Sequence, residues 1–424
     1  MSDLKKMYHT LNRDSFPAEM SLTIGDQTIR FAKKLWNIGG EDRGLRYGEN
    51  PDQPAALYEI KESSFSMDGV AFQQGQNKLV SALKEENLIQ SGKHPGKINL
   101  TDVDNGINML QYLTAKPAAI ILKHNNPCGA AWSEAGLFTA LEKAFAADRI
   151  AAFGGTIVVN RTLDKACAEF INSSYFEVIA APDYDADALA VLTTKKNLRI
   201  IKLPALADLE KVVGIPFLDI KSLLDGGLII QASFRNRILS VDDFLPAETE
   251  KDGTTFLARK PTPKEADDLL FAWAVEAGVT SNSIIFARDG ATVSIGTGEQ
   301  DRVGCVELTI QKAYTKYADK LAFEKHKLSL YELKLKAKTD KALADSLQEI
   351  LAQTDADKGG LPGTVLVSDG FFPFRDGVDL AVAQGVTAIA QPGGSIRDWE
   401  IIQAVNEASP QVAMVFTGQR SFKH

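Results

Sequence analysis

The chain has 424 residues, a formal net charge of -8, 24% charged residues and 45% hydrophobic residues. At roughly 150 residues per domain this length suggests two or three domains, and the composition excludes a disordered or collagen-like chain. The acidic balance argues against a general nucleic-acid binder, because such a binder neutralises phosphates with Lys and Arg. It still allows a local basic pocket for one small anion.

The sequence gives no sign of secretion or membrane insertion. Three cysteines cannot build a disulfide framework, and the first residues carry no apolar signal segment. No stretch reaches the ~18 apolar residues that a membrane helix needs. We therefore expect a reduced, cytoplasmic protein that does not contact a membrane.

Short apolar runs alternate with amphipathic segments rich in Ala and Leu. The predicted buried strands are 117–122, 155–159, 177–181, 227–231, 283–287, 364–367 and 387–390. The predicted helices include 137–147, 264–277 and 399–408. Strands that alternate with helices favour the α/β class, with a mainly parallel or mixed sheet covered on both faces.

Two changes in composition suggest domain boundaries. An acidic stretch punctuated by prolines at 242–263 suggests a passage from one α/β unit to the next. The residues from about 313 to 358 are rich in Lys, Leu and Ala, which predicts a helical excursion within the second unit. We therefore expect an N-terminal extension over 1–43, a first unit over 44–241 and a second unit over 242–424.

Among the five histidines, His124 is the one in a position suited to catalysis. Lys123 and His124 directly follow the predicted strand 117–122 and precede a turn, Asn-Asn-Pro-Cys-Gly. Ligands of open α/β sheets collect beyond the carboxyl ends of strands. A regular strand would direct the two side chains to opposite faces, but the turn breaks that regularity and allows both to reach one pocket. The Lys123 ammonium would then disfavour a positive charge on the imidazole. A strand-end pair that merely faces water is the alternative.

Further segments carry candidate binding residues. Arg46 and Tyr47 stand in a Gly- and Asn-Pro-containing loop, and a guanidinium suits bidentate capture of phosphate or carboxylate, although a surface turn is the alternative. Ser281-Asn282-Ser283 opens a predicted strand. The Gly-Thr-Gly at 296–298 ends an apparent hairpin and lacks the third glycine of a dinucleotide fingerprint, so we reject a Rossmann site there.

The last third of the chain adds two segments. Phe-Phe-Pro-Phe-Arg-Asp at 371–376 is typical either of core or of a loop that grips a flat heterocycle. The Gly-Gly-Ser turn at 393–395 is expected to precede a helix, whose N-terminus could bind a carboxylate or the polar atoms of a ring.

Taken together and in this order, these segments resemble the AICAR transformylase family, the C-terminal half of the bifunctional purine-biosynthesis protein. The motifs are Arg-Tyr-Gly-x-Asn-Pro, Lys-His-x-x-Pro-x-Gly, Ser-Asn-Ser with Gly-x-Gly-x-x-x-Arg, Phe-Phe-Pro-Phe-Arg-Asp and a terminal Arg, over about residues 44–424. The resemblance implies two cytidine-deaminase-like α/β units and an intertwined homodimer with active sites at its interface. It also implies transfer of a formyl group from 10-formyltetrahydrofolate to the 5-amino group of AICAR.

Site residues follow from the resemblance position by position. It implies that His124 is the general base and that Lys123 stabilises the transition state. It implies nucleotide-binding roles for Arg46 and Tyr47 at the phosphate end, for Glu177 at the ribose, and for Gly154, Asn282, Phe371 and Arg420. It implies folate-binding roles for Arg302, Asp376, Ser395 and Ile396. The unpaired cysteines argue against zinc, and a bound monovalent cation stays an open possibility.

The chain departs from the family pattern at three points. Asp52 stands where the family usually has His, and Glu299 stands where it usually has Gln. Only residues 1–43 precede the first motif, so we expect the cyclohydrolase domain to be missing and a separate IMP cyclohydrolase to act as partner. Whether formate plus ATP replaces the folate donor stays open, although no phosphate-cradling Gly-rich loop with Lys is present.

Two alternative functions remain. A zinc deaminase would need paired cysteine ligands, whereas Cys128 stands alone after Pro127. A non-catalytic nucleotide-binding or assembly subunit of the purine pathway is the other alternative. The intact Lys123–His124 pair argues against it.

Overall fold

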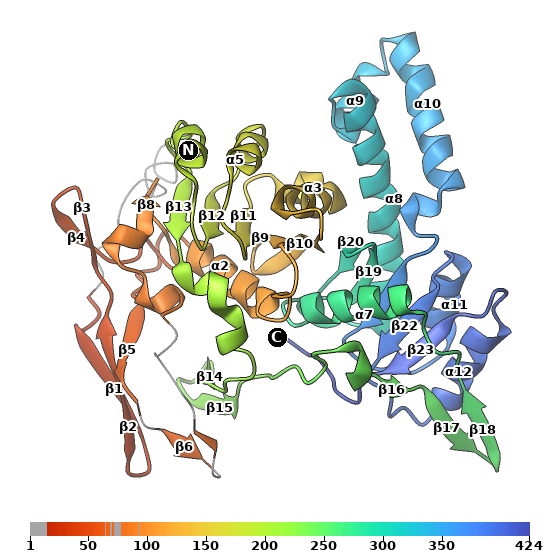
Figure 1. Cartoon of the computed structure of the whole chain (residues 1–424), viewed down its shortest axis with the longest axis horizontal. Helices are drawn as coiled ribbons and strands as arrows, with labels where there is room; N and C mark the ends of the chain where they lie inside the picture. Colours follow the sequence, from red (N-terminus) through yellow and green to blue (C-terminus); the bar gives the residue numbers. More distant parts are fainter. Residues whose placement is uncertain (1–14, 64, 68–69, 72–77, 93) are drawn as a thin grey trace. The chain divides into compact units, whose positions relative to one another are not determined.

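The computed structural model describes residues 15–63, 65–67, 70–71, 78–92 and 94–424 (Figure 1). Its backbone divides into two compact units, each built from two separate stretches of sequence: Met1–Ile107 with Thr156–Arg235, and Asn108–Gly155 with Asn236–His424. The predicted α/β class is confirmed. The assignment of 44–241 and 242–424 to two cytidine-deaminase-like units stays a prediction.

The α/β core of the first unit is built on parallel strands. Its elements are β8 (Leu88–Gln90), α2 (Lys97–Leu110, ending in the second unit), β11 (Thr156–Val159), α5 (Lys165–Asn172), β12 (Val178–Ala181), α6 (Ala186–Leu192) and β13 (Arg199–Lys202). β11, β12 and β13 are parallel neighbours, and β8 pairs antiparallel with β13. Every residue of β11 and β12 is buried, as is typical of parallel strands covered on both faces. The strands predicted at 155–159 and 177–181 are confirmed.

The rest of the first unit consists of short antiparallel strands and 3-10 turns. They are β1 (Glu19–Ile24), β2 (Gln27–Lys33), β3 (Trp36–Ile38), β4 (Glu41–Arg43), β5 (Tyr58–Glu62), β6 (Ser66–Met67), β7 (Val70–Ala71), η1 (Val80–Ala82), η2 (Glu85–Asn87), η3 (Pro204–Lys211), β14 (Leu218–Ser222) and β15 (Leu228–Ala232). β1, β2 and β5 form one sheet, and Ile29 and Phe65 form a small core beside it. Residues 15–43 of the predicted N-terminal extension thus belong to folded β structure; residues 1–14 lie outside the described residues.

One predicted buried strand is exposed. The run predicted at 227–231 does form β15, but β15 pairs only with β14 in a two-stranded hairpin, and all its residues are exposed. The prediction of burial is wrong. An apolar run favours a strand, but it does not determine whether another part of the chain packs on that strand. Ile220 pairs with Ile230 and Ser222 with Leu228, so one face of the hairpin is largely apolar.

A mixed sheet forms the core of the second unit. Its strands are β9 (Ala118–Lys123), β10 (Asn126–Trp132), β16 (Leu245–Pro246), β19 (Ile284–Arg288), β20 (Ala291–Gly296), β21 (Val365–Ser368), β22 (Ala388–Gln391) and β23 (Ala413–Phe416). The spatial order is β16-β23-β22-β21-β19-β20-β10-β9. β21, β22 and β23 are parallel, and the other neighbours within this unit are antiparallel. The strands predicted at 117–122, 283–287, 364–367 and 387–390 are confirmed.

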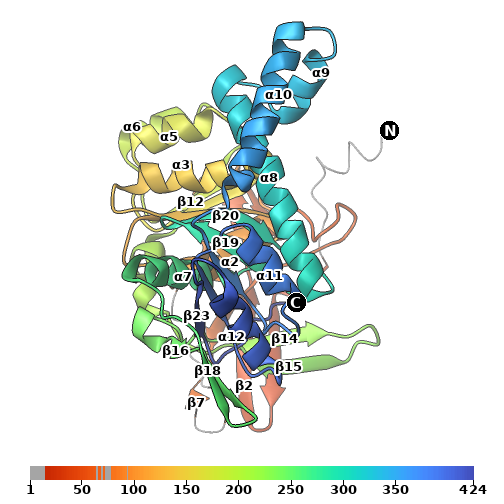
Figure 2. The ribbon, with the colours of Figure 1, turned by 90° about the vertical axis from the view of Figure 1, so that its right-hand side faces the viewer.

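Helices cover both faces of these strands. They are α3 (Leu137–Ala147), α4 (Arg149–Ala152), α7 (Pro263–Glu276), α8 (Arg302–His326), α9 (Leu330–Lys336), α10 (Lys341–Ala356), α11 (Asp376–Ala383) and α12 (Asp398–Glu407), with the 3-10 turns η4 (Val241–Asp243) and η5 (Lys358–Gly360). Figure 2 shows α7 on the opposite side of β19 and β20 from α8 and α11. Ile284, Phe286 and Leu366 point to the α8, α11 and α12 side, where they share one core with Val306 and Ile401. The three predicted helices are confirmed.

The predicted helical excursion is confirmed, and it begins earlier than composition suggested. α8 already starts at Arg302, where the Asp301 carboxylate caps it by accepting a hydrogen bond from the N–H of Gly304. α8, α9 and α10 pack through a small core of their own around Leu333 and Ile350. They extend away from the strands of the second unit, at the top of Figure 1.

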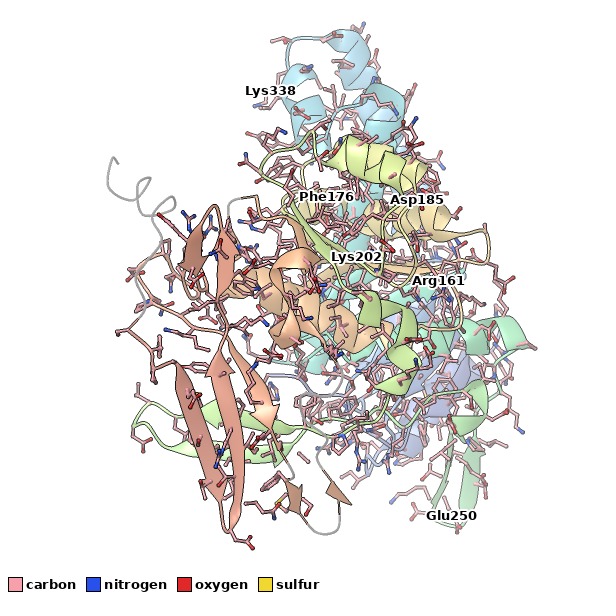
Figure 3. All side chains as sticks on the ribbon, turned by 60° about the vertical axis from the view of Figure 1, so that its left-hand side comes forward. Arg161, Phe176, Asp185, Lys202, Glu250 and Lys338 are labelled. Carbon is pink, nitrogen blue, oxygen red and sulfur yellow. The ribbon has the colours of Figure 1, made fainter. Side chains whose placement is uncertain are left out.

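The acidic stretch 242–263 contains the hairpin of β17 (Glu248–Lys251) and β18 (Thr254–Leu257), and Figure 3 labels Glu250 close to its tip.

In the described part of the chain, no helix combines the length and the apolar character that crossing a bilayer requires.

Candidate active site

One edge of the sheet in the second unit gathers most of the predicted site residues. β9 ends where β10 begins, and the end of β20 and the end of β21 both lie beside the start of β19, because Ile284 pairs with Gly296 and with Ser368. Antiparallel neighbours bring the end of one strand to the start of the next. Lys123, His124 and Asn282 therefore come from segments that meet at this edge.

His124 lies in a tight hairpin turn. β9 and β10 are joined by His124 and Asn125 alone, and both residues have positive φ, 54° and 61°. A two-residue loop with positive φ at both positions is the type I′ turn that suits the twist of antiparallel strands. His and Asn adopt this left-handed region more readily than most side chains. The turn leaves the imidazole of His124 exposed.

Lys123 is the last residue of β9 and is half-buried. Its ammonium donates a hydrogen bond to the carbonyl oxygen of Phe153, with 2.8 Å between Nζ and O. Phe153 is followed by Gly154, whose φ of 75° only glycine adopts without cost. Lys123 and Gly154 are thus adjacent at this edge; convergence of the Lys123 and His124 side chains on one pocket stays a prediction.

Asn126 ties the turn to the neighbouring strands. Its Oδ1 accepts hydrogen bonds from the N–H of Thr280, at 2.9 Å, and from the hydroxyl of Thr297, at 3.0 Å. Thr280 comes directly before the Ser281-Asn282-Ser283 segment, and Thr297 follows β20. A single carboxamide therefore fixes the His124 turn relative to Asn282.

Asn282 is held by the side chain of Arg302. Arg302 Nη2 donates to Asn282 Oδ1 at 2.7 Å, and the Asn282 amide nitrogen donates to the carbonyl of Gln300 at 3.0 Å. Arg302 is buried and forms an ion pair with the buried carboxylate of Asp369, which also accepts a hydrogen bond from the Ser281 hydroxyl. Arg302 therefore orients the side chain of Asn282. The contact between Arg302 and folate that the resemblance implies stays a prediction.

A buried carboxyl group lies beneath this network. Glu276, at the end of α7, is fully buried and accepts a hydrogen bond from the Ser283 hydroxyl. Burial, reinforced by the negative charge of Asp369, raises the pKa of Glu276 well above its usual value. Its second oxygen, Oε2, has no hydrogen-bond partner within the described residues.

Arg420 and Phe371 meet at the same edge. The guanidinium carbon of Arg420 lies 5.3 Å from the centre of the Phe371 ring, and Phe371 follows Asp369 by two residues. The N–H of Ser421 donates to the carbonyl of Asp369 at 3.0 Å. The exposed Arg420 therefore lies close to the half-buried Phe371, and the implied nucleotide contacts of both residues stay a prediction.

Apart from Arg302, the residues implied to bind folate lie at the start of α11 and just before α12. Asp376 opens α11 and is exposed, and Ile396, just before α12, is 94% exposed. The N–H groups of Gly394 and Ser395 donate to the carboxylate of Asp398, at 2.7 and 3.1 Å. The protein's own carboxylate therefore occupies these two N–H groups, and a ligand site at the N-terminus of α12 stays a prediction. The folate contacts stay a prediction.

The first unit carries the other predicted residues. Arg46 is buried, its Nη2 donates to the Tyr47 hydroxyl at 2.7 Å, and its guanidinium carbon lies 4.5 Å from the centre of the Tyr47 ring. The Tyr47 carbonyl accepts a hydrogen bond from the N–H of Lys97, the first residue of α2. Arg46 makes no ion pair within the described residues, which leaves its charge uncompensated near a helix N-terminus. This arrangement suits an anion.

Glu177 lies directly before β12 and faces Arg199, the first residue of β13. Figure 3 labels Phe176, which precedes Glu177, and Lys202, at the other end of β13. Arg199 is 2% exposed and its Nη1 lies 3.5 Å from Glu177 Oε2. Burial and the charge of Arg46 hold the pKa of Arg199 below its usual value, and Glu177 opposes that shift.

The three cysteines carry thiols with raised pKa values. Burial raises the pKa of Cys128, Cys167 and Cys305 to about 12 in each case, so the thiols stay protonated at neutral pH. Over the residues described, no group of three or more His, Cys, Asp or Glu side chains is placed to hold a metal ion.

Sequence reasoning missed three residues of these networks: Arg199, Glu276 and Asp369. Two of them carried a signal. Asp369 follows a buried strand at its carboxyl end, as Lys123 does, and Arg199 is a charged residue that opens an apolar strand. Glu276 had no such signal, because nothing within the predicted helix 264–277 marks this one charged side chain as buried.

Comparisons with known proteins agree on one family. A model of the AICARFT/IMPCHase bienzyme family matches residues 5–312. The chain is 35% identical over 380 residues to the bifunctional purine biosynthesis protein PurH of Caldicellulosiruptor saccharolyticus. It is 35% identical over 382 residues to that of Magnetococcus marinus, and 37% over 382 residues to that of Cereibacter sphaeroides. Each match covers 90% of this chain but 59% of the relative, so the chain spans less than two thirds of these relatives' length.

Proposed function

The chain belongs to the AICARFT/IMPCHase bienzyme family, and on that premise we propose that it transfers the formyl group of 10-formyltetrahydrofolate to the 5-amino group of AICAR. The observation that carries the proposal is the edge of the second unit's sheet where the His124 turn, the Asn282 segment and the Arg420 segment meet. The imidazole of His124 is exposed there.

The reaction needs both a base and an acid. The 5-amino nitrogen of AICAR attacks the formyl carbon and loses a proton, and the carbonyl oxygen becomes an oxyanion in the tetrahedral intermediate. The bond from this carbon to folate N10 then breaks, and N10 takes up a proton. The products are formyl-AICAR and tetrahydrofolate.

We assign proton removal to His124 and oxyanion stabilisation or protonation of N10 to Lys123. A well-placed general base contributes on the order of 10²–10⁴ in rate, which matters here because the amine lone pair is delocalised into the imidazole carboxamide. The Lys123 ammonium lies at the end of β9, bonded to a carbonyl rather than to a carboxylate. Its charge therefore remains available to a developing negative charge.

The remaining residues bind the two substrates in this proposal. Arg46 and Tyr47 bind the nucleotide phosphate, Glu177 binds the ribose, and Gly154, Asn282, Phe371 and Arg420 contact the rest of the nucleotide. Asn282 suits the carboxamide of AICAR, because Arg302 and the Gln300 carbonyl fix which way its amide points. The folate side comprises Arg302, Asp376, Ser395 and Ile396.

The exposed hairpin supports a homodimer as the working form. Ile220, Leu228 and Ile230 lie on one face of the β14–β15 hairpin and are 41%, 53% and 41% exposed. The other face carries Asp219, hydrogen-bonded to Gln231. Apolar side chains gathered on one exposed face mark an interaction surface. We propose that a second copy of the chain covers this face and that the active sites form at the dimer interface.

The proposal is tested by incubating the purified chain with AICAR and 10-formyltetrahydrofolate. We expect tetrahydrofolate and formyl-AICAR in equal amounts, followed by absorbance and mass spectrometry. Absence of both products, with AICAR bound, would overturn the proposal. Parallel incubations with formate plus ATP, and with formyl-AICAR alone, report on the donor and on ring closure. Exchange of one acyl–nitrogen bond for another gives little driving force, so a reaction that consumes formyl-AICAR is expected to follow.

A further inference from the structure

The carboxylate of Glu177 is anchored through one oxygen only. Oε2 lies 3.4 Å from the amide nitrogen of Asn99 and 3.5 Å from Nη1 of Arg199. Oε1 has no hydrogen-bond partner within the described residues, and the Glu177 side chain is 39% exposed. One oxygen thus faces two donors of the protein and the other is free to accept hydrogen bonds from a ligand.

The two anchoring side chains are themselves fixed. Asn99 is 8% exposed, and its Oδ1 accepts a hydrogen bond from the N–H of Gly96 at 3.1 Å, which leaves the amide nitrogen to face Glu177. Arg199 also holds the backbone of Glu177. Its N–H and its Nη1 both donate to the Glu177 carbonyl, at 3.0 and 3.3 Å.

Burial of Arg199 makes its contacts with Glu177 energetically important. Arg199 is nearly inaccessible at 2% exposure, and its Nε has no partner within the described residues. A buried guanidinium is costly unless a carboxylate compensates it. Among the residues that the structure describes, Glu177 is the carboxylate within ion-pair distance of Arg199, while Arg46 adds a second positive charge nearby. Glu177 is therefore held in place by a group that cannot itself reach a ligand.

We propose that Arg199 and Asn99 are positioning residues that direct Oε1 of Glu177 at the hydroxyl groups of a ribose, so that this cluster selects ribonucleotides over 2′-deoxyribonucleotides. The inference rests on the proposed function, which supplies the nucleotide and places its ribose at Glu177. It adds the residues that set the sugar specificity. A fixed carboxylate gains a charged hydrogen bond from the hydroxyl, and it has no partner when the hydroxyl is absent.

The test compares AICAR with its 2′-deoxyribose form, by calorimetric binding and by kinetics. The variants are Arg199→Met, Arg199→Lys, Asn99→Ala and Glu177→Gln, with Arg30→Gln on the exposed face of β2 as control. We expect the wild-type chain to prefer the ribose form by about 10-fold or more. Arg199→Met should weaken binding of the ribose form by a similar factor and leave the 2′-deoxy form within about 2-fold. Arg199→Lys should restore part of the preference.

A double variant separates positioning from general support of the fold. If Arg199 acts through Glu177, Arg199→Met adds little to the loss already caused by Glu177→Gln, whereas independent effects would add. Equal losses for both sugars, or additive losses, would overturn the inference. Binding is measured without folate, so a chain that fails to transfer formyl groups but still distinguishes the sugars would refute the proposed function alone.

Discussion

The ammonium of Lys423 donates a hydrogen bond to the carbonyl oxygen of Asn125, with 2.8 Å between Nζ and O. The two residues are 298 positions apart in the sequence. Asn125 is the second residue of the turn that carries His124. Lys423 also donates to the carbonyl of Gly278, at 3.1 Å, just before the segment that carries Asn282. One side chain therefore links the His124 turn to the residues just before the segment that carries Asn282.

The first prediction concerns this link. Lys423→Met removes both hydrogen bonds but keeps an unbranched side chain, so the His124 turn loses a restraint while its own backbone geometry remains. We expect kcat for formyl transfer to fall roughly 10- to 100-fold, because small misplacements of a catalytic group are costly. Lys334→Met, which changes an exposed residue of α9, is the control and should leave kcat unchanged. Equal rates for the two variants would show that the link does not position the turn.

The second prediction concerns Glu276 and pH. Its raised pKa means that the native chain holds this proton at pH values where the unfolded chain, with a pKa near 4.5, has released it. The free energy of unfolding therefore falls as pH rises between the two pKa values, by about 1.4 kcal/mol per pH unit for this one group. Glu276→Gln cannot ionise, so it should lose this component of the slope.

Urea unfolding at a series of pH values above about 5 checks this expectation. The wild-type chain should lose stability relative to Glu276→Gln as pH rises. Glu248→Gln, on exposed β17, should follow the wild-type chain. If the free energy of unfolding changes with pH equally in the wild-type chain and in Glu276→Gln, the buried carboxyl group does not stay protonated.

The third prediction concerns the apolar face of the β14–β15 hairpin. Ile220→Asp with Ile230→Asp places two carboxylates opposite one another on this face. We expect sedimentation equilibrium to show a dimer for the wild-type chain and a monomer for the double variant, with formyl transfer lost in the monomer. Lys221→Gln changes the opposite face and should stay dimeric. A wild-type monomer that is active would contradict the proposed homodimer.

Much of the local structure could be predicted from the sequence. The strands that end at Lys123 and at Ser368 are continuous apolar runs, and α3 was predicted with its observed bounds, because periodicity and chain turns are local signals. The position of His124 beyond a strand was equally readable. Its left-handed turn was not predicted, although the Asn-Asn-Pro sequence favours a turn there.

The side-chain networks and the packing of the elements could not be predicted, because they depend on contacts between distant parts of the sequence. Nothing near Arg302 indicates that its partner is Asp369, 67 positions away, or that it orients Asn282. The Gly-Gly-Ser sequence likewise does not reveal that the N–H groups of Gly394 and Ser395 donate to the carboxylate of Asp398. The apolar run at 228–232 has the sequence pattern of a buried strand, yet all its residues are exposed. What packs against a segment is decided elsewhere in the chain, and periodicity does not report it.

The central claim is that His124 is the base in formyl transfer. The best variant is His124→Asn, because Asn tolerates the positive φ of this turn, whereas Ala would add backbone strain. The most direct measurement is the single-turnover rate of transfer with enzyme in excess over AICAR, alongside AICAR affinity. The account predicts a rate about 10²- to 10⁴-fold below wild type, unchanged affinity within about 2-fold, and a wild-type rate for His326→Asn on α8. Transfer by His124→Asn at the wild-type rate would contradict it.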